Sequence, residues 1–369
     1  MASCPCGAIR LWAGDVKIRW RKVGTDVNLE ARGKAKAIAL LSGGLDSTLA
    51  AAVVKRLGVE VIGLHVQILF DSSERRSQAL ASAAAQVGIP LRTLDRCEEQ
   101  LEVVRRPQHG RGSGMNPCID CRIFMLRAAR EAMEEEGAQF VVTGEVLGQR
   151  PMSQNLQSLL VEAEESGLGE RLVRPLSAAL LPETLPVKEG WIRRDGLLAL
   201  RGRGRDAQIE LARALGIEDY PQPAGGCLLT EKVYSARLRD AFAHGDRDLM
   251  RKEEFLLLRY GRQFRLSDRT KLIVGRNEGE NAILDRYSLG RIRLEPAETV
   301  GPVALVEGDP AADELRLAAA LVARYCDRGG KDPIALTLLS AGTQTLLSVV
   351  PLSSDDPRIA AWRIGEASG

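Results

Sequence analysis

Short apolar runs alternate with helix-forming segments from about residue 36 onward. The apolar runs cover residues 37–41, 59–69, 89–95 and 139–145, and the helix-forming segments between them cover 48–58, 73–88 and 124–137. Nearly continuous apolar runs of this length are typical of parallel strands buried on both faces. The repeated strand–helix units predict an α/β protein with a doubly wound parallel sheet, whose ligands bind beyond the carboxyl ends of the strands.

The pattern also predicts four regions along the chain. An N-terminal extension over 1–35, with a β-hairpin, precedes the α/β domain, which we place at 36–232. A basic helical linker at 233–264 then leads to a smaller C-terminal α+β domain at 265–369.

Composition narrows the class of protein. The 369 residues are 45% hydrophobic and 27% charged, which excludes a disordered or fibrous chain. No apolar stretch approaches the roughly 20 residues that a bilayer span needs, and no export signal is evident, so we expect a cytoplasmic protein without a membrane partner. The net charge of +2 does not by itself demand a nucleic-acid partner, which needs a local basic surface.

A glycine-rich turn joins the first apolar run to the first helix. It comprises Ser42, Gly43, Gly44, Leu45, Asp46 and Ser47, and we call residues 42–47 the phosphate loop. Backbone N–H groups of such a turn and of the following helix converge on an anion, and the glycines let a phosphate approach the backbone. The kinase-type loop is excluded because no lysine follows the turn. A structural turn with an Asp or Ser cap is the alternative.

Three of the seven cysteines have a spacing that suggests chemistry. Cys118 and Cys121 open a predicted helix as a CxxC motif, and Cys227 follows in a Gly/Pro loop. Three thiolates can hold a [4Fe–4S] cluster with one iron open to sulfide. Alternatively, one cysteine carries a persulfide and a second resolves the disulfide that results. A structural zinc site needs four ligands, and none of the three histidines lies near these cysteines in the sequence.

The other cysteines carry weaker signals. Cys4 and Cys6 lie near the start of the chain, where accidental metal binding is the most that we expect. Cys97 and Cys326 are predicted to be packing residues or free thiols.

Arginines are concentrated in two places. Arg201, Arg203 and Arg205 alternate with glycine before a helix, where a nearby anion, ATP or RNA phosphate, is the simplest stabiliser and a flexible exposed loop is the alternative. A second series runs from Arg237 to Arg276 and suits phosphate contacts to structured RNA, although a solvated helix face is the usual explanation of such a run.

In their order, SGGLDS, NPCIDC, TGEVLGQRPMSQN, RPLSAALLPET and PAGGCLLT resemble the PP-loop tRNA thiouridine synthetases of the ATP pyrophosphatase superfamily, over about residues 36–232. The resemblance implies that ATP adenylates a uracil carbonyl oxygen in tRNA and that sulfur then displaces AMP. It also implies roles for particular residues. The pyrophosphate, with Mg²⁺, is held by Ser42, Gly43, Gly44, Asp46 and Ser47, and the nucleotide pocket is lined by Gly144 and Gln149, with Arg150 and Gln154 near it.

TGEVLGQ followed by SQ is similar to the motif of 4-thiouridine synthase, whereas the cysteine triad is similar to cluster-dependent 2-thiouridine synthetases. We therefore favour 4-thiouridine and leave 2-thiouridine open. Asp46, Cys118, Cys121 and Cys227 are the catalytic candidates, and the three cysteines are the cluster ligands. The sulfur donor is expected to be a persulfide from a cysteine desulfurase, or sulfide. Residues 1–35 are too short for the THUMP domain of 4-thiouridine synthase, and its rhodanese-type domain is not evident.

Residues 265–350 resemble the NFACT-R RNA-binding domain, which suggests where tRNA binds. Two other functions stay open: a PP-loop enzyme that acts on a small molecule with ammonia or sulfur, and a non-catalytic RNA-binding protein. Glu145 is an acid near the predicted chemistry that could simply cap a helix, and His65 and His109 are expected to be structural or surface residues.

Overall fold

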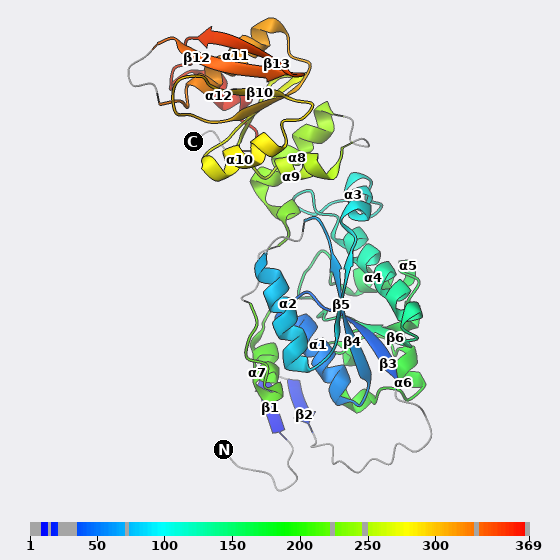
Figure 1. Cartoon of the computed structure of the whole chain (residues 1–369). Helices are drawn as coiled ribbons and strands as arrows, with labels where there is room; N and C mark the ends of the chain where they lie inside the picture. Colours follow the sequence, from blue (N-terminus) through cyan, green and yellow to red (C-terminus); the bar gives the residue numbers. More distant parts are fainter. Residues whose placement is uncertain are drawn as a thin grey trace. The chain divides into compact units, whose positions relative to one another are not determined.

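The computed structural model describes residues 9–13, 16–20, 35–70, 74–221, 226–245, 250–327 and 332–365. The chain forms two compact units, Met1–Cys227 and Leu228–Gly369 (Figure 1). No helix in the described ranges combines the length and the apolar character needed to cross a membrane.

The first unit consists of a hairpin followed by alternating strands and helices. Its elements are β1 (Ile9–Ala13), β2 (Val16–Trp20), β3 (Lys36–Leu40), α1 (Leu45–Arg56), β4 (Glu60–Gln67), α2 (Glu74–Val87), β5 (Leu91–Asp95), α3 (Cys97–Arg105), α4 (Cys118–Glu135), β6 (Phe140–Val142), α5 (Leu156–Glu165), β7 (Leu172–Val173), α6 (Leu185–Lys188) and α7 (Asp206–Leu215). Strands β1 and β2 pair antiparallel, which confirms the hairpin, while Cys4 and Cys6 lie outside the described residues.

A five-stranded parallel sheet forms the centre of this unit, in the order β5-β4-β3-β6-β7. Alternate residues of β3 point to opposite faces: Ala37 and Ala39 pack with α1, α2 and α7, whereas Ile38 and Leu40 pack with α4. Helices thus cover both faces of the sheet (Figure 1). The predicted doubly wound parallel sheet is confirmed.

Strand order determines where the site lies. The central strand β3 pairs with β6 in parallel, with Ala39 opposite Val142. Because parallel neighbours end at the same edge of a sheet, the segment after β3 and the segment after β6 emerge side by side. The first segment contains the phosphate loop, and the second contains Gly144 and Glu145.

The second unit contains a single antiparallel sheet with helices. Its elements are α8 (Lys232–His244), α9 (Lys252–Leu257), β8 (Arg262–Ser267), β9 (Thr270–Val274), α10 (Glu278–Arg286), β10 (Ile292–Pro296), β11 (Ala304–Gly308), α11 (Ala312–Ala323), β12 (Ile334–Ser340), β13 (Thr343–Val349) and α12 (Pro357–Trp362).

The six strands follow the order β13-β12-β10-β11-β9-β8. Leu272 and Val274 face α11, and Ile273 between them packs with Leu257 of α9 and Leu284 of α10. A smaller α+β unit at the C-terminal end of the chain is therefore confirmed. The segment 233–264, predicted as a linker, holds α8 and α9 and lies within this unit, where Leu238 and Phe255 are buried.

The arginine series is used partly inside the second unit. Arg237 is buried and donates hydrogen bonds to the carbonyl oxygens of Leu258 and Gly261, both at 2.9 Å. Arg276 pairs with Glu280. The arginine series in the sequence therefore does not form a basic surface along its whole length, because some of its guanidinium groups bind carbonyl and carboxylate groups of the protein itself.

Candidate active site

The phosphate loop is closed by its own serines. The Ser42 amide donates to Ser47 Oγ at 3.2 Å, and Ser47 Oγ donates to the Gly44 carbonyl at 2.9 Å. Gly43 has φ +73°, a left-handed conformation that favours glycine. The hydrogen bonds and the glycine together fix a tight turn at the start of α1, a setting suited to an anion.

A second segment presses against the loop where β6 ends. A Cβ placed on Gly144 would lie 2.5 Å from the backbone carbonyl carbon and oxygen of Asp46 and from the Ser47 amide nitrogen. Only glycine allows this approach of two backbones. Gly144 therefore lies directly against the phosphate loop, and its place in a nucleotide pocket stays a prediction.

Asp46 faces this segment. Gln149 Nε2 donates to Asp46 Oδ2 at 2.9 Å, so these two candidate residues meet. The other carboxylate oxygen, Asp46 Oδ1, is buried and has no hydrogen-bond partner. An unpartnered carboxylate oxygen beside an anion loop fits a hydrated Mg²⁺ that accompanies a bound triphosphate.

The arginine–glycine loop lies beside the same segment. Arg201 and Leu147 form a parallel bridge, and the Gly202 amide donates to the Leu147 carbonyl at 2.8 Å. Arg201 and Arg203 are exposed, and Arg205 is half-buried. The fold thus brings these arginines next to residues 147–149, more than fifty positions earlier in the sequence.

The CxxC motif opens α4 as predicted. Asn116 Nδ2 donates to Cys118 Sγ at 3.0 Å, and Gln100 Nε2 donates to Cys121 Sγ at 3.4 Å. Burial raises the pKa of the Cys121 thiol to about 12, although the hydrogen bond from Gln100 lowers it. The charges of Cys227 and Cys118 raise this pKa further. Cys227 is therefore within electrostatic reach of the CxxC motif, although it comes more than a hundred residues later.

The chemistry of the three cysteines fits thiolate ligation in part. None of them is in a disulfide, and two receive amide N–H hydrogen bonds of the kind that stabilise ligated sulfur. Across the described ranges, however, no three His, Cys, Asp or Glu side chains are arranged to hold a metal ion. The structure brings the three cysteines into one region without forming a metal site there.

Glu145, next to Gly144, forms the centre of a buried ion cluster. Its carboxylate accepts a hydrogen bond from Arg174 Nε at 2.7 Å and lies 3.0 Å from Arg122 Nε. Arg174 also approaches the fully buried Glu162 at 3.4 Å. Because Arg122 directly follows Cys121, the dipeptide Gly144-Glu145 contacts both the phosphate loop and the cysteine helix.

The two acids of this cluster carry different charges. Burial would raise the pKa of Glu145, but Arg174 and Arg122 hold it at about 2. Burial and the charge of Glu145 raise the pKa of Glu162 to about 9. At neutral pH, Glu145 is ionised and Glu162 holds a proton, so one net positive charge from the two arginines lies beside Cys121.

Several residues of the site were not predicted from the sequence. Arg122, Arg174 and Glu162 belong to separate elements, and only the position of Arg122 after the CxxC motif could have drawn attention to it. His65 is buried with Nδ1 3.2 Å from the Leu41 carbonyl oxygen, and His109 pairs with Glu165, so both are structural as expected.

Two family models match the chain. Residues 33–179 match the thiamine biosynthesis protein ThiI, and residues 261–363 match the NFACT protein RNA binding domain. Both resemblances stated from the motifs are thus confirmed: a ThiI-type PP-loop domain is followed by an NFACT-type domain. The second match begins after α8 and α9.

Curated relatives match the first part of the chain. The tRNA-specific 2-thiouridylase MnmA of Xanthobacter autotrophicus is 30% identical over 180 residues, 45% of this chain and 46% of that protein. A probable tRNA sulfurtransferase of Methanothermobacter thermautotrophicus is 33% identical over 155 residues, 40% of this chain and 38% of that protein. The chain spans less than half the length of these relatives.

Among solved structures, a 4-thiouridine synthetase–RNA complex with bound ATP has a TM-score of 0.33 at 22% identity, covering 50% of this chain and 52% of that chain. The U34-tRNA thiolase NcsA from Methanococcus maripaludis with its [4Fe-4S] cluster has a TM-score of 0.32 at 18% identity, covering 53% and 63%.

Gly144→Ala should disturb the phosphate loop, because the added methyl group meets backbone atoms that cannot rotate away. We expect the free energy of unfolding to fall by about 1–3 kcal/mol and ATP affinity to fall at least about tenfold. Denaturant titration and nucleotide titration measure the two effects. Gly279→Ala in α10, whose nearest atom is 3.4 Å away, is the matched control and should change neither. Unaltered ATP binding in Gly144→Ala would contradict the role of this contact.

Glu145→Gln and Glu162→Gln should differ although the substitution is the same. Loss of the Glu145 charge leaves two arginines without their carboxylate and should lower the free energy of unfolding by about 3–5 kcal/mol. Glu162→Gln replaces a neutral acid by a neutral amide and should cost little at pH 7.

The pair also predicts a pH dependence. The folded state keeps the Glu162 proton up to about pH 9, whereas the unfolded chain releases it near 4.5, so rising pH destabilises the native protein across this window. The difference in unfolding free energy between Glu162→Gln and the native protein should therefore change with pH. From pH 5 to pH 8 it should shift by at least about 1 kcal/mol in favour of the variant, as measured by urea denaturation. A constant difference would mean that Glu162 is ionised in the folded state.

Proposed function

We propose that the chain is an ATP-dependent tRNA sulfurtransferase that adenylates a uracil carbonyl oxygen in tRNA and replaces that oxygen with sulfur. The observation that carries the proposal is the double contact of Gly144-Glu145. Gly144 lies against the phosphate loop, and Glu145 binds the arginine that follows Cys121. An anion loop and a group of thiols joined in this way suit a reaction that needs ATP and sulfur in succession.

The first step activates the carbonyl. The uracil oxygen attacks the α-phosphorus of ATP, an O–P bond forms, and the bond from the α-phosphorus to the bridging oxygen breaks as pyrophosphate leaves. Backbone amides of the phosphate loop hold the pyrophosphate charge, and Asp46 would be the residue that holds an Mg²⁺ ion accompanying ATP. The carbonyl oxygen thereby becomes part of AMP, a far better leaving group.

The second step delivers sulfur through a cysteine persulfide. The terminal persulfide sulfur attacks the activated carbon, and AMP leaves with the former carbonyl oxygen. A second thiol then attacks the cysteine sulfur of the protein–tRNA disulfide, which forms a protein disulfide and releases the thiolated base with the electron pair. A thiol reductant restores the cysteines. Cys118, Cys121 and Cys227 are the candidates for both roles.

The same cysteines would be the ligands if the sulfur site contains a [4Fe–4S] cluster. Asn116 and Gln100 would then stabilise the ligated sulfurs of Cys118 and Cys121 through their amide N–H groups. Such a cluster, when bound, supplies an iron with an open position for sulfide.

Transfer RNA is the partner that the relatives suggest. The curated relatives are named as tRNA sulfurtransferases and 2-thiouridylases, and the second unit matches an RNA-binding domain. The ThiI match and the TGEVLGQ motif favour 4-thiouridine as the product, and 2-thiouridine is the other candidate.

Deletion of the gene should remove one thionucleoside from cellular tRNA. Mass spectrometry of tRNA nucleosides, with and without the gene, identifies the product: loss of 4-thiouridine or of 2-thiouridine names the modified atom. Restoration by a plasmid copy is the control. An unchanged thionucleoside profile in a strain with no redundant enzyme would contradict RNA thiolation and favour a small-molecule substrate.

Replacement of Cys118, Cys121 or Cys227 by Ala should lower tRNA thiolation at least about a hundredfold, because each step of sulfur transfer needs a thiol. ATP-dependent release of pyrophosphate in the presence of tRNA should persist in these variants, since adenylation precedes sulfur transfer. Cys97→Ala, at a buried packing cysteine, is the matched control and should thiolate normally.

Iron analysis and the visible absorption of anaerobically purified protein distinguish the two sulfur routes. Iron bound by the native protein and lost in each of the three variants supports the cluster. Full activity of iron-free protein with a persulfide donor supports the relay. Full thiolation by all three variants would contradict both routes.

A further inference from the structure

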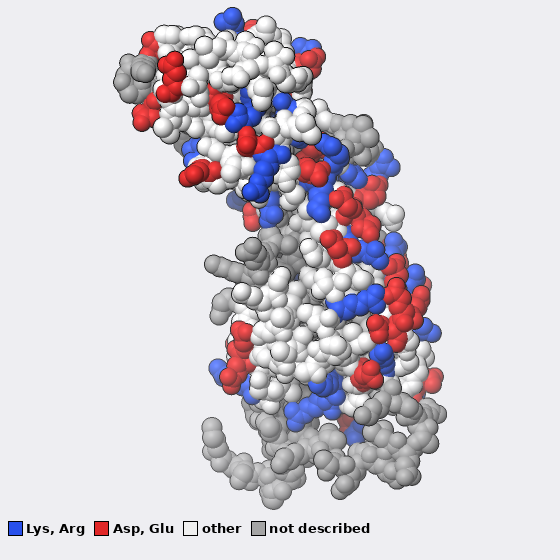
Figure 2. Space-filling view, in the orientation of Figure 1, with Lys and Arg blue, Asp and Glu red and all other residues white. Residues whose placement is uncertain are grey.

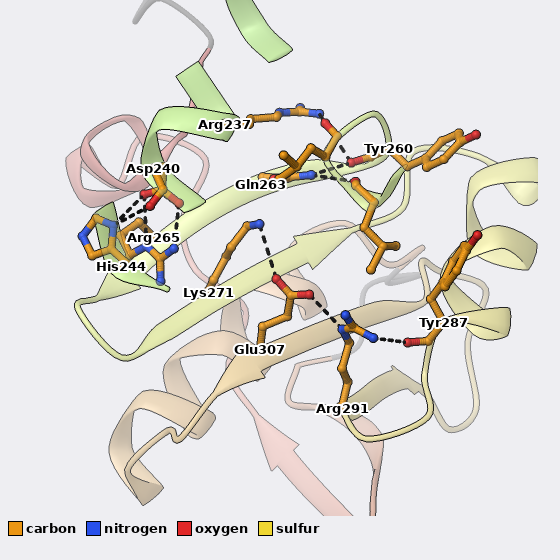
Figure 3. A network of polar contacts seen from close by, with 12 residues as sticks. Arg237, Asp240, His244, Tyr260, Gln263, Arg265, Lys271, Tyr287, Arg291 and Glu307 are labelled. Carbon is orange, nitrogen blue, oxygen red and sulfur yellow. Dashed lines mark hydrogen bonds and ion pairs between the residues drawn. The ribbon is translucent and has the colours of Figure 1, made fainter. Parts of the chain in front are cut away.

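The second unit contains a charged cavity that the proposed reaction does not use. Its volume is about 410 Å³, and residues of α8, α9, β8, β9 and β11 and of the turn before β10 contribute to its wall. Figure 3 shows Glu307 between Lys271 and Arg291, with Arg265, Asp240 and His244 to one side. All of these side chains lie within one unit, so the cavity is formed by that unit alone.

The sheet register creates a row of charges along this wall. Arg265 of β8 is opposite Lys271 of β9, and Lys271 is opposite Glu307 of β11. Lys271 shares the face of Ile273, which packs towards α9 and α10 and away from α11. Arg291, just before β10, completes the row through its 2.8 Å contact with Glu307.

The row has more cations than carboxylates. Arg265 pairs with Asp240 at 2.6 Å, but Lys271 and Arg291 share the single carboxylate of Glu307. Although burial opposes it, these two cations hold the pKa of Glu307 below its usual range, so its one negative charge is fully present. Three cations thus face two carboxylates, with like charges directly opposite each other in the register, an arrangement that an added anion stabilises.

Lys271 has unused hydrogen-bonding capacity. Its side chain is only 6% exposed, yet among the described residues its one ion pair is the 3.3 Å contact with Glu307. An ammonium group has three N–H donors, and a buried charge is costly unless its donors are satisfied. The cavity beside Lys271 provides room for an acceptor with several oxygens, such as a phosphate group.

The rim of the cavity contributes two further arginines, along with the carboxylates of Glu254 and Asp268. Arg251 and Arg269 both line it, both are exposed, and neither forms an ion pair with any residue in the described ranges. Figure 2 shows Lys and Arg side chains interleaved with Asp and Glu side chains on the part of the second unit where Figure 1 places α8, α9 and α10. Leu289 at the same rim is 92% exposed and offers an apolar surface beside the charges.

We infer that this cavity is a phosphate-binding site for RNA, in which Lys271, Arg291 and Arg265 contact a backbone phosphate and the two rim arginines contact its neighbours. Helices α8 and α9 precede the segment that matches the RNA-binding family. The wall of the cavity therefore includes residues of these two helices as well as residues of the matched segment. RNA is favoured over a free phosphate because this unit matches an RNA-binding family and because the rim places two further arginines beside the cavity. The inference rests on the proposed function only for its choice of RNA as partner.

The test is binding of tRNA to the full chain, without ATP or a sulfur donor, as a function of salt. Lys271→Gln and the double variant Arg251→Gln, Arg269→Gln should each lower affinity about tenfold and reduce the slope of log affinity against log salt by about one per lost phosphate contact. Arg316→Gln, at an exposed position of α11 on the other face of the sheet, is the matched control and should bind as the native protein does. The rim double variant changes only exposed side chains, so it remains informative if Lys271→Gln destabilises the unit.

Each outcome decides the inference. Equal affinity and equal salt slope in the folded variants and the control would overturn it. Competition by inorganic phosphate distinguishes the sources: phosphate binding that Lys271→Gln abolishes, with tRNA binding unchanged, assigns the cavity to a free phosphate and overturns the choice of RNA. Weaker tRNA binding by the variants, in a protein that thiolates no RNA, would sustain this inference and contradict the proposed function. Normal thiolation by the variants with unchanged tRNA affinity would support the proposed function and overturn this inference.

Discussion

The pairing of Glu145 with two arginines is the interaction on which the first unit's site depends. Arg174 directly follows β7 and Arg122 lies near the start of α4, so one carboxylate after β6 connects three elements. Separation of Glu145 from the two arginines would leave buried charges without a partner. An uncompensated buried charge costs several kcal/mol of stability. Glu162 avoids a second buried charge by holding its proton.

This constraint explains how two chemical functions share one edge of the sheet. Gly144 can lie against the backbone of Asp46 only because β6 is held in register beside β3, and Glu145 follows it without a gap. The phosphate loop therefore contacts Gly144, and the CxxC helix contacts Glu145 of the same dipeptide through Arg122. In the proposed reaction, activation of an oxygen and delivery of a sulfur would occur at one carbon atom, and a rigid connection between the two sites would favour that sequence of steps.

The second unit uses its arginines in two ways. Arg237 and Arg276 satisfy carbonyl and carboxylate groups of the fold, and they are unavailable to a partner. Lys271, Arg291 and Arg265 instead line a cavity, and Lys271 and Arg291 share the carboxylate of Glu307 there. The distinction follows from the register of the sheet, which puts like charges opposite each other across β8 and β9.

The sequence by itself determined the parallel α/β sheet, the phosphate loop after its first strand, the CxxC motif at a helix start and the smaller α+β domain, because each depends on local periodicity, turn chemistry or a contiguous motif. Strand order, the contact of Gly144 with Asp46, the ion cluster around Glu145 and the approach of Cys227 to the CxxC motif were decided only by the tertiary structure. So was the difference between structural and available arginines in the second unit. Many of these contacts join residues that are distant in the sequence, such as Arg174 with Glu145 and Gly144 with Asp46, and local patterns carry no information about which distant groups meet.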